Sequence, residues 1–243
     1  MKIVDCPWEI ENIGKKTIEI TLDGKNENLQ EVLKAIRNEY EYVVVKIPMN
    51  MVEYNCLMAK ECFTCMEVQM NVSINPVQFD YSKISHISAA VRMRPESGNK
   101  GIEKVLSHIT PKMFSTDRIT LDKEFGPAIG MRRYQNWLTA EVKSGKSQLV
   151  QMIYKGAEVG FMLYRITDSF FHLLLNGLYE EWQGKHLGII TPSSPLLLLK
   201  QTDEKVSVVG TSISSNNIPV VKLYNRLGFT LDSQTYVFTK HLK

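Results

Sequence analysis

A glycine-bearing turn between a predicted strand and a predicted helix is the segment of this sequence best suited to bind an anion. The turn is residues 183–188, Gln-Gly-Lys-His-Leu-Gly. The apolar run Phe170–Asn176 before it is typical of a buried strand, and the apolar residues from Ile189 onward favour a buried helix. Free backbone N–H groups and the positive end of the helix dipole favour phosphate, and Lys185 adds a positive charge. The predicted chemistry is phosphate binding.

A second segment repeats this order near the C-terminus. Residues 206–212 form a predicted strand, and Asn217 caps a predicted helix that ends at Gly228-Phe229. Tyr224 lies on this helix at helical spacing from Val220, Val221 and Leu227. This spacing by itself favours packing against these neighbours.

Together the two segments resemble the signature segments of the GNAT N-acetyltransferase superfamily. Residues 183–188 are similar to its Q/R-x-x-G-x-G/A pyrophosphate loop, except that His186 replaces the central glycine. The second segment is similar to its strand, Asn-capped helix and Leu-Tyr…Gly-Phe ending. The resemblance implies an α/β fold with a mixed, mostly antiparallel central sheet flanked by helices. It also implies acetyl-CoA as the cofactor.

The resemblance further implies a role for each segment. The strand before the turn would splay from its neighbour at a bulge, expected at Gly177, and its freed backbone groups would hold pantetheine and polarise the acetyl carbonyl. Leu175, Asn217 and Tyr224 would take part in catalysis, with Tyr224 as the general acid, because a phenol keeps its proton at neutral pH and the CoA thiolate can accept it. The residues implied to contact the cofactor are Leu175, Asn176, Gly177, Leu178, Gln183, Gly184, Lys185, His186, Leu187, Gly188, Asn217 and Tyr224.

Two prolines complicate the helix after the turn. A proline costs about 3 kcal/mol inside a helix unless it lies in the first turn, and both Pro192 and Pro195 fall in this segment. Ser194-Pro195 fits a cap and first helical position. The sequence therefore leaves open a kinked helix, or one that begins only at Ser194, and either would loosen the anion site.

Composition narrows the class of protein. The net charge is +3 with acids and bases interspersed, whereas proteins that bind duplex nucleic acid carry a concentrated basic face. No apolar run reaches the ~18 residues of a spanning helix, and no signal-peptide pattern is present. The four cysteines lack the partners of a zinc site. We expect a cytoplasmic protein with reduced thiols, no nucleic-acid partner, no membrane span and no metal.

The elements that must position these residues fall into two groups. Residues 1–80 alternate strand and helix: strand 16–22, a helix over 29–36 capped by Asn28, strand 42–47, a helix opened by Asn50 with Val52, Cys56, Ala59 and Phe63 inward, and strand 66–74. No catalytic cluster is visible there. Then follow strand 87–93, helix 102–109, a polar surface loop over 113–122, a helix from Gly126, strands 148–154 and 159–166 joined by a turn at Lys155-Gly156, and a closing strand 234–239.

The whole layout resembles one branch of the superfamily, the dTDP-fucosamine acetyltransferases, with a small partial acetyltransferase-like domain before the catalytic one. The segment Phe114–Trp137, with Phe-Ser-x-x-Arg and Arg-Tyr-x-x-Trp, points to this branch. The resemblance implies domains 1–80 and 84–243, and the amine of a nucleotide-linked amino sugar as acceptor. The residues proposed to line the acceptor pocket are Arg132, Arg133, Tyr134, Trp137, Thr211 and Ser212.

No Cys or Ser constellation is placed to form an acyl-enzyme, so we expect direct attack of the amine in a ternary complex. The general base stays open among His172, Glu180 and Glu181. Alternative functions are acetylation of a peptide, amino acid or polyamine, acyl-CoA binding without turnover, and simple nucleotide binding. The pair Arg132-Arg133 argues against a polyamine. The sequence does not fix the oligomeric state and is compatible with a homodimer.

Overall fold

The computed structural model of the chain describes residues 1–24, 28–202 and 204–242. Its strands are β1 (Lys2–Asp5), β2 (Thr17–Thr21), β3 (Tyr42–Pro48), β4 (Thr64–Ile74), β5 (Val91–Glu96), β6 (Gln148–Tyr154), β7 (Ala157–Thr167), β8 (Phe170–Leu178), β9 (Val208–Ser214) and β10 (Thr230–His241). Its α-helices are α1 (Trp8–Ile13), α2 (Leu29–Ile36), α3 (Glu53–Lys60), α4 (Ser85–Ser88), α5 (Gly98–His108), α6 (Arg118–Leu121), α7 (Gly126–Lys143), α8 (Ile190–Gln201) and α9 (Ile218–Leu227). Short 3₁₀ turns occupy Tyr81–Ile84 and Glu180–Trp182.

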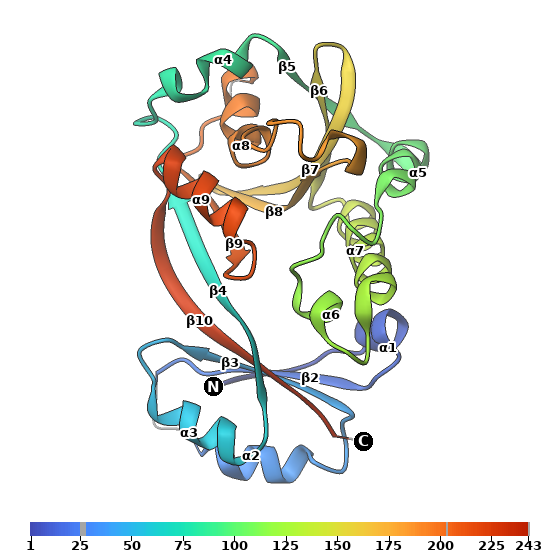
Figure 1. Cartoon of the computed structure of the whole chain (residues 1–243), viewed down its shortest axis with the longest axis vertical. Helices are drawn as coiled ribbons and strands as arrows, with labels where there is room; N and C mark the ends of the chain where they lie inside the picture. Colours follow the sequence, from blue (N-terminus) through green and yellow to red (C-terminus); the bar gives the residue numbers. More distant parts are fainter. Residues whose placement is uncertain (25–27, 203, 243) are drawn as a thin grey trace.

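The described strands form one continuous ten-stranded sheet in the order β1-β2-β3-β10-β4-β9-β8-β7-β6-β5. All neighbouring pairs are antiparallel except β2–β3 and β8–β9. Figure 1 shows the strands of the N-terminal part at one end of the molecule and β5 to β8 at the other, joined by the long strands β4 and β10. The predicted mixed, mostly antiparallel α/β fold is confirmed.

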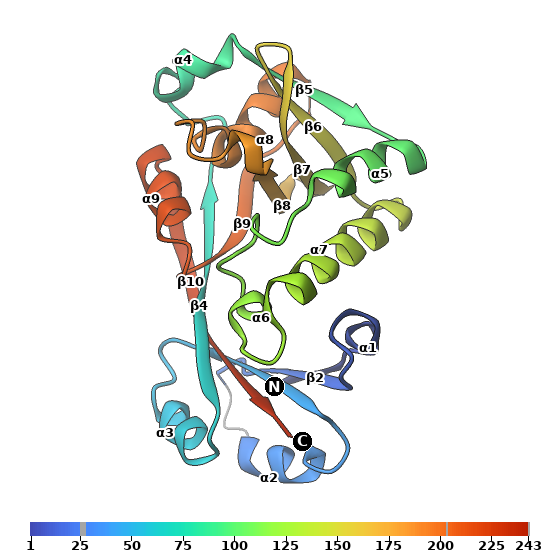
Figure 2. The same ribbon diagram turned by 45° about the vertical axis from the view of Figure 1, so that its right-hand side comes forward.

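Strand β10 belongs to both ends of the molecule. Its residues 235–241 pair with β3, and residues 230–239 pair with β4. Figure 2 shows the same strand running from beside α9 down to the N-terminal helices. Since the last strand of the chain completes the N-terminal part of the sheet, the division at residues 80–84 stays a prediction.

Helices cover both faces of the β5–β8 half of the sheet. Along β7 every residue from Val159 to Tyr164 except Gly160 has a buried side chain, as expected for a strand packed on both faces. Met162 packs in the core that contains α8 and α9, and Phe161 and Leu163 pack in the core that contains α5 and α7. A separate core fills the N-terminal part, between α2, α3 and strands β2 and β3.

Several local predictions are confirmed. The Asn28 side chain accepts a hydrogen bond from the backbone N–H of Glu31, which caps α2. Lys155 and Gly156 both have positive φ, 49° and 84°, between β6 and β7. This is the two-residue turn whose twist matches that of the flanking strands.

Other local predictions are wrong. Helix α3 begins at Glu53 with no side-chain cap, so Asn50 does not open it, and its buried residue is Met58, whereas Val52 and Cys56 are exposed. Residues 85–88 are helical, and the strand predicted from residue 87 begins at Val91. Both segments are short, and tertiary packing overrides the structure that their local sequence pattern favours.

Candidate functional site

A cavity of about 1370 Å³ lies between the middle of the sheet, helices α7 and α9, and the segment 112–118. Binding sites for one small molecule are typically about 300–1,000 Å³. The cavity therefore has room for a large cofactor together with a second substrate. The segment 113–122, predicted to be a surface loop, forms part of its wall and contains α6.

The cavity enters the sheet where β8 and β9 separate. The two strands pair in parallel only at Phe170–His172 against Val208–Gly210. Strand β8 continues to Leu178 with β7 on its other side, and no described strand pairs with it on the β9 side beyond His172. At the end of the paired region, Thr211 Oγ1 donates a hydrogen bond of 2.8 Å to the carbonyl oxygen of Leu173. Backbone groups of residues 174–178 on this side border the gap.

A bulge in β8 lies at Leu174, and the prediction that placed it at Gly177 is wrong. Leu175 pairs with Leu163 while Leu173 pairs with Tyr164, which leaves Leu174 as the extra residue. Gly177 has another function in the fold. A Cβ atom there would lie 3.2 Å from Met113 Cε, so the absence of a side chain gives the end of the Met113 side chain room against the strand.

The turn at residues 183–188 presents a row of free amides. Among the described residues, no acceptor takes a hydrogen bond from the backbone N–H of any residue from 184 to 189, whereas the N–H groups of Gln183 and Ile190 are both bonded. Six consecutive free amides at the start of α8 are an arrangement suited to an anion. Gln183, Gly184 and Gly188 line the cavity.

His186 adopts the backbone conformation that suits the glycine of the family pattern. Its φ is +60°, in the left-handed region, as is the φ of +74° at Gly184. The imidazole is exposed and is not part of the cavity wall. The path of the turn is therefore compatible with histidine at this position. Lys185 lies with its Nζ atom 4.8 Å from the centre of the Trp182 ring.

Helix α8 begins at Ile190, so a start at Ser194 is excluded. Pro192 lies in the first turn, where a proline is tolerated, and Pro195 lies inside the helix. Pro195 cannot donate to the carbonyl of Thr191. Asn176 Nδ2 and Ser194 Oγ donate to that oxygen instead, at 2.6 Å and 2.7 Å. Asn176, expected to contact the cofactor, thus joins β8 to the start of α8.

Replacing Asn176 tests this link. Asn176→Ala is expected to lower the free energy of unfolding by about 1–3 kcal/mol, because it leaves a partly buried carbonyl with one donor fewer. Urea denaturation measures the change, and Asn136→Ala, which removes an amide contact at the α1–α7 boundary, serves as a control distant from α8. Only Asn176→Ala is expected also to weaken acetyl-CoA binding. An unchanged midpoint and unchanged binding would show that the link is dispensable.

Tyr224 and Asn217 lie at α9, whose Leu223 side chain is close to Gly188 of the turn. The Asn217 side chain accepts from the N–H of Val220 at 3.3 Å, which confirms the predicted cap. Tyr224 is 3% exposed and packs edge-on against Phe229 at 4.8 Å, yet it also borders the cavity. Its hydroxyl has no hydrogen-bond partner among the described residues. Burial raises the pKa of Tyr224, so the phenol is protonated at neutral pH.

The two arginines proposed for the acceptor are both bonded to residues of helix α1. Arg132 donates to the carbonyl oxygen of Asn12 at 2.6 Å and 3.0 Å. Arg133 forms an ion pair with Glu9 at 2.8 Å. Both contacts fasten α7 to the N-terminal part. Because Glu9 already balances the charge of Arg133, this pair of arginines does little to disfavour a cationic acceptor.

The remaining residues proposed for the acceptor lie on the cavity wall. Tyr134 stacks on Phe114 at 4.1 Å between ring centres and donates to Asp117 at 3.1 Å, and Trp137 is its neighbour on α7. Across the cavity, the hydroxyl of Ser212 bonds the side chains of Gln69 and Asn71. The wall thus combines aromatic rings with polar groups.

Of the three candidate bases, His172 borders the cavity, and Glu180 and Glu181 do not. Glu180 pairs with Lys112 at 2.7 Å. His172 lies on β8 at the last residue paired with β9. Burial, followed by the charge of Arg165, lowers the pKa of His172 from 6.5, so the imidazole is neutral at pH 7. His172 is the candidate base with suitable position and protonation state.

Sequence reasoning missed the part of the wall that comes from β4 and α6. Glu67, Gln69 and Asn71 of β4 and Arg118 of α6 border the cavity. The N-terminal part was expected to hold no functional cluster. The strict alternation of polar residues along 67–73 was visible in the sequence, but it fits equally well a strand face exposed to solvent.

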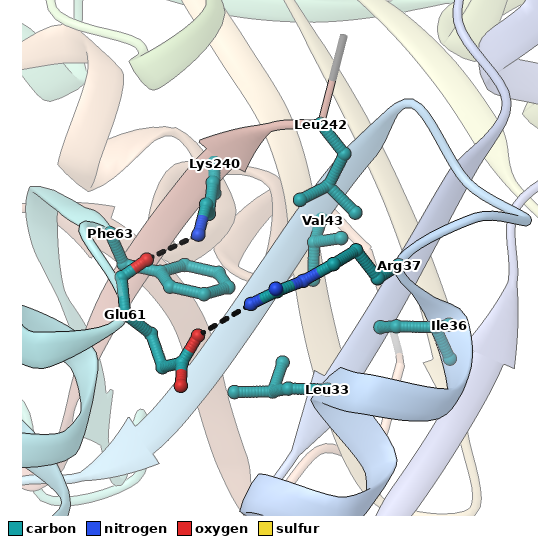
Figure 3. Close-up of a pocket in the computed structure, with 8 residues that line it drawn as sticks. All are labelled: Leu33, Ile36, Arg37, Val43, Glu61, Phe63, Lys240 and Leu242. Carbon is teal, nitrogen blue, oxygen red and sulfur yellow. Dashed lines mark hydrogen bonds and ion pairs between the residues drawn. The ribbon is translucent and has the colours of Figure 1, made fainter.

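A second pocket lies in the N-terminal part between α2, β3 and β10 (Figure 3). Arg37 and Lys240 both bond Glu61 at its edge, Arg37 at 3.1 Å to the carboxylate and Lys240 to the backbone carbonyl. Its volume is about 10 Å³, close to the space that one water molecule requires. It is too small for an organic ligand.

In the described part of the chain, no helix is long and apolar enough to cross a membrane.

Comparison with known proteins adds fold information. No family model and no curated protein sequence matches the chain. A GCN5-related N-acetyltransferase from Sphaerobacter thermophilus is structurally similar, with TM-score 0.62 and 11% identity over 93% of this chain and 73% of that one. A tandem GNAT protein from the clavulanic acid biosynthesis pathway has a TM-score of 0.58 and 12% identity, over 93% of this chain and 75% of that one. A GCN5-related N-acetyltransferase from Kribbella flavida has a TM-score of 0.57 and 11% identity, over 93% of this chain and 81% of that one.

At these identities the similarity establishes the fold. It covers 93% of this chain in each case. The chain has the fold of the GCN5-related N-acetyltransferases.

Proposed function

We propose that this protein is an acetyl-CoA-dependent N-acetyltransferase that transfers acetyl directly to a primary amine. The observation that carries the proposal is the row of six free amides from 184 to 189, beside the gap between β8 and β9. Free amides at a helix start suit a diphosphate. The unbonded hydroxyl of Tyr224 on the adjoining helix supplies a proton donor. A simple nucleotide binder would have no use for that phenol.

The residues present fit acetyl-CoA. The amides of 184–189 would hold its diphosphate, and the unpaired edge of β8 from Leu174 to Leu178 would bond its pantetheine arm. When bound, this cofactor supplies an acetyl group activated as a thioester. Backbone N–H groups on the same edge would stabilise the negative charge that develops on the carbonyl oxygen.

The side chains around the gap divide the proton transfers between them. His172 would accept the proton that the amine loses as its nitrogen bonds the acetyl carbon. Tyr224 would give its proton to the sulfur as the carbon–sulfur bond breaks. Exchange with solvent restores both groups. No acyl-enzyme is required, because both substrates fit the cavity together.

Replacing His172 gives a pH-dependent prediction. Because the pKa of His172 lies below 6.5, we expect kcat/KM of the wild type to fall as the pH drops through that lower value and to be level near pH 7. His172→Gln should lower kcat/KM at least tenfold at pH 7 and abolish this acid limb. The control variant His108→Gln should keep both the wild-type kcat/KM at pH 7 and the fall in kcat/KM at low pH. An unchanged pH profile in His172→Gln would exclude His172 as the base.

For the acceptor we propose the amine of a nucleotide-linked amino sugar, with the reaction taking place in the cytoplasm. The stacked Phe114 and Tyr134 rings and the nearby Trp137 are suited to a sugar ring, and Gln69, Asn71 and Ser212 to its hydroxyls. A peptide, amino acid or polyamine is the alternative acceptor.

The test is an acetylation screen read by release of the CoA thiol. Nucleotide-linked amino sugars, free amino sugars, peptides and polyamines are each incubated with the protein and acetyl-CoA. Transfer to an amine supports the proposal, and the rank order identifies the acceptor. Acetyl-CoA binding without transfer to any amine would instead support a non-catalytic acyl-CoA-binding role.

A further inference from the structure

Arg118 is a buried charge on the cavity wall that lacks hydrogen bonds. Its side chain is 13% exposed, and its Nε atom is buried without a partner. Among the described residues its guanidinium makes one ion pair, at 4.0 Å to Glu67. A guanidinium has five N–H donors, and a buried charge normally has all its partners. Arg118 therefore has donors to spare, and it borders a space large enough for a substrate.

The acidic neighbours of Arg118 have other partners. Asp117 accepts from Tyr134 Oη at 3.1 Å and from the N–H of Ile119 at 2.9 Å. Glu19 forms an ion pair with Lys46 at 2.8 Å. Glu67 is the remaining acidic neighbour. Burial raises the pKa of its carboxyl, and the opposing effects of a hydrogen bond from Ser214 and the charge of Arg118 do not cancel this rise. These carboxylates balance the charge of Arg118 but do not supply the hydrogen bonds it lacks.

Arg118 lies away from the reacting end of the cavity. Thr211, whose hydroxyl bonds the Leu173 carbonyl beside the gap, pairs with Val72 of β4. Glu67, next to Arg118, is five residues further along β4, which corresponds to about 16 Å along the strand. The proposed diphosphate site lies before α8, which packs in one core with α9, apart from the core of α5 and α7. Arg118 is therefore placed to contact the far end of an acceptor, not the cofactor.

We propose that Arg118 binds a phosphate-type anion on the acceptor, so that the preferred substrates are elongated amines that carry such an anion away from the amino group. This inference rests on the proposed acetyltransferase function. The planar fork of a guanidinium matches two oxygens of a phosphate, which would satisfy its free N–H groups. The anion contact predicted from the sequence for Arg132 and Arg133 is thereby assigned to Arg118, which has free donors. Polyamines, which carry no anion, would be poor acceptors.

The kinetic test compares a nucleoside-diphosphate-linked amino sugar with the same amino sugar lacking the nucleotide. The wild type should prefer the diphosphate-linked form at least tenfold in kcat/KM. Arg118→Met should raise KM for that form at least tenfold, with KM for acetyl-CoA and for the free sugar unchanged. Glu67→Gln should lower KM for the diphosphate-linked form, because a competing carboxylate is removed. A control, Arg37→Met, removes an arginine of the other pocket and should change nothing (Figure 3).

Two further variants guard against misfolding. Arg118→Lys keeps the charge without the fork and should give an intermediate KM. The double variant Arg118→Met with Glu67→Gln removes both buried charges, and should fold as the wild type does while lacking the preference for the diphosphate-linked amine. An unchanged preference in the folded double variant would overturn the proposal.

A binding measurement separates this inference from the proposed activity. The protein is saturated with CoA, which occupies the amides before α8, and is then titrated with inorganic pyrophosphate. Wild type should bind pyrophosphate, and Arg118→Met at least tenfold more weakly. Binding that is absent in the wild type, or equal in Arg118→Met, would overturn the anion site even where acetyl transfer is observed. Failure of all amines to react, with pyrophosphate binding intact, would overturn only the proposed activity.

Discussion

Tyr224→Phe is expected to slow acetyl transfer at least tenfold, up to the roughly 10²–10⁴-fold that a general acid contributes. The ring would keep its packing against Phe229, and the hydroxyl that is removed has no partner among the described residues. Stability and acetyl-CoA affinity should therefore be nearly unchanged. Turnover under saturating acetyl-CoA and calorimetric titration measure the two effects separately.

The control for this experiment is Tyr154→Phe, which removes a phenol hydroxyl from β6 outside the cavity. It should leave turnover unchanged. If Tyr224→Phe turned over at the wild-type rate, another group would have to protonate the thiolate, and Tyr224 would have only a packing role. A parallel loss of stability would instead indicate that the change acts through the fold.

Gly188→Val is expected to weaken acetyl-CoA binding at least thirtyfold, corresponding to about 2 kcal/mol. Gly188 is the fifth residue in the row of free amides and borders the cavity. An added Cβ atom would meet one described neighbour, Leu223 Cδ1, at 3.3 Å. Because that atom is the end of a flexible side chain, the fold should tolerate the change. The new side chain would occupy the space next to the amides that the diphosphate needs.

His186→Gly is the matched control within the same turn. His186 is exposed, lies outside the cavity wall and has the positive φ that glycine adopts easily. Affinity for acetyl-CoA should stay within about threefold of the wild type, well under 1 kcal/mol. Equal affinity of wild type and Gly188→Val would contradict the placement of the diphosphate at this turn.

Features set by neighbouring residues could be predicted from the sequence. The Asn217 cap, the Lys155-Gly156 turn and the strand–turn–helix around residues 183–188 each depend on a few adjacent residues, and each is present in the fold. Even the departure at His186 keeps the expected path, because the backbone conformation of the turn accommodates an exposed side chain.

Features that depend on distant residues could not be predicted. Strand β10 enters the N-terminal part of the sheet, so the polar face of β4 borders the cavity instead of solvent. Arg133 forms an ion pair with Glu9 of α1, whereas Arg118 makes no ion pair with α1 among the described residues and keeps unbonded N–H groups. Similar residue types on neighbouring segments thus differ in their available donors, and composition alone does not distinguish them.

The most direct test of the account follows the backbone amides of residues 184–189 by ¹⁵N–¹H NMR while CoA is added to the whole protein. Hydrogen bonding to a diphosphate should shift these six resonances most strongly and to lower field, with smaller changes along β4. If these amides stayed unchanged while CoA bound, or if CoA did not bind, the proposal of a diphosphate site at the start of α8 would be contradicted, and the acetyltransferase mechanism with it.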